Sequence, residues 1–94
     1  MRILGKGYFV TQDADDSFIS IRFRRGTGLV TILRRVRRIF KSMGWKVDSL
    51  EDLGTREVSR KCFEGEKGRS PCLIWDVRFR RRENGVYNCD NPDA

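Results

Sequence analysis

The chain has 94 residues, enough for one domain (residues 1–94) with a single modest core. Its 20 lysines and arginines exceed its 13 aspartates and glutamates, and the net charge of +7 favours a polyanionic partner, although solubility alone explains many basic proteins. No stretch approaches the roughly 18 apolar residues of a membrane span and the start lacks the apolar run of a signal peptide, so we expect a cytoplasmic protein that does not enter a membrane.

The first part of the chain predicts a β-hairpin. Residues 7–12 (GYFVTQ) are aromatic and β-branched, and the acidic run 13–16 (DADD) is typical of a turn. Residues 18–25 (FISIRFRR) alternate between apolar and polar side chains, which predicts a half-buried strand. The apolar set is Ile19, Ile21 and Phe23, and the opposite set is Ser20, Arg22 and Arg24.

The best-defined element is an amphipathic helix from about Gly28 to Met43, with Thr27 as its expected N-cap and Gly44 as its C′ residue. At about 100° per residue, the apolar and basic side chains fall on opposite sides of this helix. The apolar side comprises Leu29, Ile32, Leu33, Val36, Ile39, Phe40 and Met43. The basic side comprises Arg34, Arg35, Arg37, Arg38 and Lys41, with Val30 as its apolar outlier.

The rest of the chain predicts a second strand pair. Residues 48–54 read as a loop or a single helical turn, 55–63 as a strand with poor alternation, and 64–71 as a glycine-rich loop. Residues 72–82 form the clearest strand, followed by a turn at 83–85, a short edge strand from Val86 and a frayed tail over 88–94. The two sides of the clearest strand carry Leu73, Trp75, Val77 and Phe79, and Asp76, Arg78 and Arg80.

These elements predict a small α+β domain in the order β-β-α-β-β, with one antiparallel sheet and the helix packed on one face. If strands 18–25 and 72–82 are neighbours, their outward arginines form a second basic surface on the other face. These arginines are Arg22, Arg24, Arg78 and Arg80. An uncovered sheet face is normally polar, so simple solvation is the alternative explanation for them.

The helix carries its cations without any acidic residue among them. The set at i, i+3, i+4 and i+7 is Arg34, Arg37, Arg38 and Lys41. Each like-charge pair costs a few tenths of a kcal/mol, a cost that contact with an anion would offset. The forked guanidinium suits phosphate, and the absence of Asn and Gln from the helix predicts weak sequence specificity. Partial neutralisation by Asp48, Glu51 and Asp52 is the alternative.

The sequence therefore predicts a nucleic-acid-binding module whose contacts come from the helix and, in addition, from the second basic surface. It does not indicate whether the nucleic acid is DNA or RNA. The alternative is a protein-interaction module or inhibitor, for example an anti-host protein of a phage or mobile element, that docks its basic face on an acidic protein surface. Four aromatic residues are candidates for stacking on bases, although packing is their commoner role. They are Tyr8, Phe18, Trp45 and Tyr87.

We expect no enzyme, cofactor or metal. The chain has no histidine, and its carboxylates cluster only in turns such as 13–16, without a supporting motif. Three cysteines are too few for a secreted disulfide scaffold. Cys62 and Cys72 flank a loop and could pair across a hairpin, but buried thiols are the more ordinary outcome.

Overall fold

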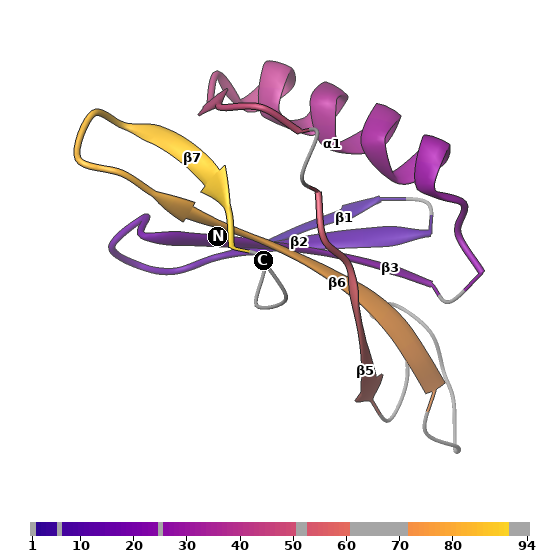
Figure 1. Ribbon diagram of the computed structural model, residues 1–94. Coiled ribbons are helices and arrows are strands. Elements are labelled where there is room, and N and C mark those ends of the chain that lie inside the picture. The colour runs from indigo at the N-terminus through magenta and orange to yellow at the C-terminus, as the bar shows by residue number, and fades with distance from the viewer. Residues whose placement is uncertain (1, 6, 25, 51–52, 61–71, 91–94) are drawn as a thin grey trace.

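The computed structural model describes residues 2–5, 7–24, 26–50, 53–60 and 72–90. Its elements are β1 (Arg2–Gly5), β2 (Tyr8–Gln12), β3 (Phe18–Arg24), α1 (Leu29–Met43), β4 (Lys46–Val47), β5 (Arg56–Arg60), β6 (Cys72–Arg81) and β7 (Val86–Cys89). The strands form one sheet in the order β1-β2-β3-β6-β7-β4, and β5 also pairs with β6. Helix α1 lies across one face of this sheet (Figure 1). The α+β fold with one helix is confirmed, whereas the predicted order β-β-α-β-β is only partly matched.

Two strands that the sequence did not predict change the sheet. β1 pairs antiparallel with β2 and adds an edge, and β4 pairs parallel with β7, so the sheet is mixed rather than antiparallel. The parallel pair follows from the path of the chain, because α1 carries it from the end of β3 back across the sheet before β4 begins. β7, predicted to be an edge strand, therefore lies between β6 and β4.

The start of α1 differs from the prediction at its cap. Gly28, in an extended conformation, is the N-cap residue and provides no side-chain hydrogen bond. Thr27, the predicted cap, instead donates both its N–H and its hydroxyl to the carbonyl of Arg24, at 3.1 and 2.7 Å. The threonine therefore closes the turn that leaves β3 and is not available to the helix.

The end of α1 is the predicted one. Gly44 has a φ of 71°, a left-handed conformation that glycine adopts without strain. Its N–H bonds the carbonyl of Lys41, and the N–H of Trp45 bonds the carbonyl of Phe40. This Schellman arrangement satisfies two carbonyls of the last turn, and the ring of Trp45 packs edge-on against Phe40 at 5.6 Å.

The core fills the space between α1 and the sheet. The helix contributes Ile32, Val36, Ile39 and Phe40, and the strands contribute Val10, Ile19, Ile21, Phe23, Val77, Phe79 and Tyr87. The predicted burial of Val36 and Phe40 is confirmed, as is the exposure of Arg34 and Arg38. Leu29 was assigned wrongly to the buried side, since 57% of it is exposed. It lies in the first turn, before Ile32 becomes the first helix residue to enter the core.

The predicted fraying from residue 88 is wrong for residues 88–90. Asn88 and Cys89 belong to β7, where they pair with β6. The N–H of Asp90 donates to the carbonyl of Arg78 at 2.7 Å, which ties the chain to β6 beyond the end of β7. Four further predictions depend on residues outside the described ones: the end of the 55–63 strand, the glycine-rich loop, the neutralising role of Glu51 and Asp52, and the pairing of Cys62 with Cys72, since Cys62 is not described.

Candidate nucleic-acid interface

The outward side of α1 is a continuous basic face, which we define as Arg34, Arg37, Arg38 and Lys41. All these side chains are exposed, and no acidic side chain among the described residues forms an ion pair with them. They span about 10 Å of the helix axis, roughly three phosphate steps of one DNA strand. The basic face therefore has no salt bridge with a described residue to break before it contacts several consecutive phosphates.

Arg35, which the sequence grouped with these cations, has a different position. Its guanidinium carbon lies 5.3 Å from the ring centroid of Tyr8, and its side chain is half-buried. A cation over an aromatic face is stabilised by the ring quadrupole. Arg35 therefore fastens the flank of α1 to β2 and is less available to a ligand than the basic face.

Of the three acidic residues proposed to neutralise the helix, Asp48 lies within the described residues and does not neutralise the basic face. Asp48 is exposed and uses its N–H to bond the carbonyl of Tyr87 at 2.9 Å, but its carboxylate makes no ion pair with the basic face. The first turn of α1 contains no acidic residue either. Within the described chain, the like-charge repulsion on the helix is left without internal compensation.

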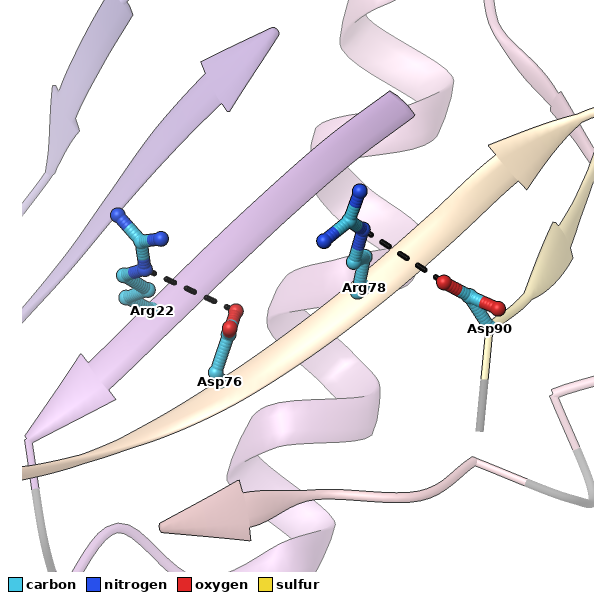
Figure 2. Close-up of polar contacts among 4 residues, drawn as sticks. All are labelled: Arg22, Asp76, Arg78 and Asp90. Carbon is cyan, nitrogen blue, oxygen red and sulfur yellow. Dashed lines mark ion pairs between the residues drawn. The ribbon is translucent and has the colours of Figure 1, made fainter. Parts of the chain in front are cut away.

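The sheet arginines lie on the face away from α1. β3 and β6 are neighbours, as the second basic surface requires, and their register pairs Arg22 with Asp76, Ser20 with Arg78 and Phe18 with Arg80. Figure 2 shows Arg22 and Arg78 on the side of the strands opposite the helix, each pointing toward a carboxylate.

Arg22 makes two contacts that stabilise the folded sheet. Its Nε lies 3.7 Å from Oδ1 of Asp76, in a pair whose side chains are only 17% and 5% exposed. The guanidinium also lies over the ring of Phe9, at 5.6 Å from the centroid, and that phenylalanine is buried on the same face. Removing either charge would take an ion-pair partner from the other in a largely buried setting, which is costly.

Arg78 is engaged in a similar way. Its Nε lies 3.6 Å from Oδ2 of Asp90, and its guanidinium lies 4.1 Å from the ring centroid of Phe18. Arg24 and Arg80 are exposed on the same face. The charge of the second basic surface is therefore partly neutralised. This surface also points away from the basic face of α1, so one straight duplex cannot contact both surfaces at once.

The four aromatic residues named as candidates for stacking on bases have different surroundings in the structure. Tyr87 is buried, Tyr8 lies under Arg35, and Phe18 lies under Arg78. Trp45 is half-buried and lines an open cavity at the C-terminal end of α1. Of the four, Trp45 is the residue whose surroundings fit contact with a base.

Sequence reasoning did not identify the polar residues that line the same cavity. They are Gln12, Asp16, Lys46, Arg81 and Asn84. Each one reads locally as an ordinary strand or turn residue, and they come from segments far apart in the chain. Trp45 is the one lining residue besides Tyr87 that the sequence had named as a candidate for stacking on bases, and not as part of a cavity.

Metal ligands, clustered carboxylates and apolar helices are the remaining features of the part of the chain that the structure describes. No cluster of three or more His, Cys, Asp or Glu side chains there could hold a metal ion. The acidic turn 13–16 is exposed, and the pKa of Asp15 is lowered by hydrogen bonds from the hydroxyl and N–H of Ser17. No helix in the described ranges is long and apolar enough to cross a bilayer.

Comparison with protein families, curated proteins and solved structures finds no match to this chain. Inference about its function therefore depends on the arrangement of its own side chains.

Proposed function

We propose that this protein binds nucleic acid through the phosphate backbone, with the basic face of α1 as the contact surface. The proposal rests on one observation about the four cations of the basic face. Their side chains are exposed, and none of them has an acidic partner among the described residues. Phosphates would replace the absent carboxylates and relieve the repulsion between neighbouring cations.

The composition of the basic face supports backbone contact over base readout. Thr31 and Ser42 are the uncharged polar side chains exposed beside the cations, and the hydroxyl of Ser42 already donates to the carbonyl of Ile39 at 2.9 Å. Specific readout in a groove usually uses Asn or Gln together with Arg. We therefore expect similar affinity for unrelated sequences.

The test measures affinity against salt by fluorescence anisotropy, using random-sequence DNA and RNA as duplexes and single strands. Four phosphate contacts predict a slope of log affinity against log salt of roughly −3 to −4 for duplex DNA. Changing Arg34, Arg37 and Arg38 together to glutamine should make the slope shallower by about 2 to 3, equally for all sequences. Glutamine retains helix propensity, so the fold should survive.

A control variant removes charge elsewhere. Arg80→Gln with Arg82→Gln changes two exposed cations outside α1 and should leave the salt slope nearly unchanged. Absence of binding to every substrate at low salt would contradict the proposal. Equal effects of the helix and control variants would show that net charge, and not the basic face, is responsible.

A second candidate function, docking on an acidic protein surface, is favoured by one observation. Leu29 and Val30 are 57% and 69% exposed, and Val30 and Leu33 line a cavity of about 300 Å³ together with Arg34 and Arg37. Apolar side chains bordered by cations suit an acidic protein segment with an apolar anchor. Val30→Ser should weaken such a complex and leave nucleic-acid affinity unchanged, and retention of a lysate partner after nuclease treatment separates the two functions.

A further inference from the structure

We propose that the open cavity at the C-terminal end of α1 holds one unpaired nucleotide of the bound strand. In this arrangement the base lies on Trp45, and the phosphodiester lies between Lys46 and Arg81. The inference rests on the proposed function and specifies its substrate: nucleic acid with an unpaired nucleotide beside the segment held by the basic face, as in a single strand or an overhang.

The cavity lies where three separate parts of the chain meet. Its volume is about 310 Å³, and it is lined by residues from the β2–β3 turn, the end of α1 and the β6–β7 turn. All three lie at the same end of the molecule (Figure 1). The hydroxyl of Tyr87 donates to the carbonyl of Asp16 at 3.0 Å and so joins the first turn to β7. This volume reaches the lower end of the range for small-ligand sites, about 300 to 1,000 Å³.

Trp45 provides an aromatic wall. Its neighbours Phe40 and Tyr87 lie at 5.6 and 6.0 Å with interplanar angles of 73° and 53°. Neither ring is stacked parallel on the indole, so parallel stacking on Trp45 is not used by the described aromatic residues. Parallel stacking on an aromatic side chain is the usual way in which proteins hold an unpaired base.

The charges around the cavity suit one phosphodiester. Lys46 and Arg81 are exposed and make no ion pair with any described residue, and Asp16 contributes one carboxylate. Two cations and one carboxylate leave one net positive charge. A phosphodiester carries one negative charge, whereas a terminal phosphate carries about 1.5 to 2 at pH 7, so an internal nucleotide matches the cavity better.

Asn84 offers an oriented donor for a base edge. Its Oδ1 accepts the N–H of Val86 at 3.0 Å, which holds the side chain in the turn. Its Nδ2 then remains as a donor without a partner among the described residues. The amide can donate to a carbonyl or ring nitrogen of the base.

The cavity continues the basic face. Gly44 lines the cavity, and Lys41 precedes it by three residues, which is about 4.5 Å along the helix axis. A strand whose phosphates follow α1 toward its C-terminus therefore reaches the cavity within one nucleotide step.

The experiment compares a blunt duplex with the same duplex carrying a short single-stranded overhang, by fluorescence anisotropy at fixed salt. The overhang should raise affinity about tenfold. This is about the gain in affinity expected when one base stacks on an aromatic ring. Arg81→Gln and Asn84→Asp should each reduce that preference and leave affinity for the blunt duplex nearly intact. Asn84→Asp retains the Oδ1 acceptor for the N–H of Val86, so the turn should be kept.

Arg80→Gln is the matched control, because it removes the same charge from the neighbouring residue on the other sheet face. The Trp75→Phe background leaves Trp45 as the single tryptophan, and its emission should be quenched by the overhang and not by the blunt duplex. Equal affinity for the two substrates, or a preference that persists in both cavity variants, would overturn the inference. Absence of binding to either substrate would instead overturn the proposed function on which it rests.

Discussion

Phe40 packs α1 against the sheet through contacts with aromatic rings of β6 and β7. It is 2% exposed, and its ring lies 4.8 Å from Phe79, 5.8 Å from Tyr87 and 5.6 Å from Trp45, in edge-to-face geometry. Such aromatic pairs contribute about 0.5–1.5 kcal/mol each beyond the area they bury. Phe40→Leu keeps an apolar side chain of comparable volume but removes all three ring contacts.

We expect Phe40→Leu to lower the free energy of unfolding by about 1.5–3 kcal/mol, since leucine recovers part of the packing. For a domain of this size each kcal/mol lowers Tm by about 4–8 °C, so Tm should fall by about 6–24 °C. The total stability of such a domain is about 5–15 kcal/mol, and the variant should therefore remain folded at room temperature.

The assay is urea unfolding followed by circular dichroism, with a double-mutant cycle that adds Phe79→Leu. The coupling between Phe40 and Phe79 should be about 0.5–1.5 kcal/mol. Leu29→Ala is the control on the same helix, because 57% of Leu29 is exposed, and it should change stability by less than about 0.5 kcal/mol. A larger loss for Leu29→Ala than for Phe40→Leu, or no coupling, would refute the packing of α1 described above.

Three further predictions concern single positions. Val36→Asp should unfold the domain, because Val36 is fully buried, while Arg38→Glu on the opposite side should leave Tm within a few degrees by thermal melting. Gly44→Ala should cost about 1–2 kcal/mol in urea unfolding, since its φ of 71° is left-handed, and an unchanged midpoint would contradict that geometry. Ser17→Ala should raise the pKa of Asp15 toward its ordinary value, measured by NMR titration, because it removes the hydroxyl hydrogen bond that favours the carboxylate.

The positions of strands and helix that depend on local patterns were predictable from the sequence. Alternation placed Ile21 and Phe23 in the core, and helical periodicity placed Val36 and Phe40 there, because each pattern repeats at the period of its own element. Gly44 ended the helix as expected, since few other residues adopt its backbone conformation at low cost. The basic face of α1 follows from the same periodicity.

Tertiary structure decided which cations remain available. Arg22 and Arg78 have carboxylate neighbours, and Arg35 lies on Tyr8, because strand register and helix packing bring together residues that are distant in the chain. Local periodicity records the spacing within one element and contains no information on what lies across from it. The parallel pairing of β4 with β7 and the cavity around Trp45 have the same origin, since each requires separate segments to meet.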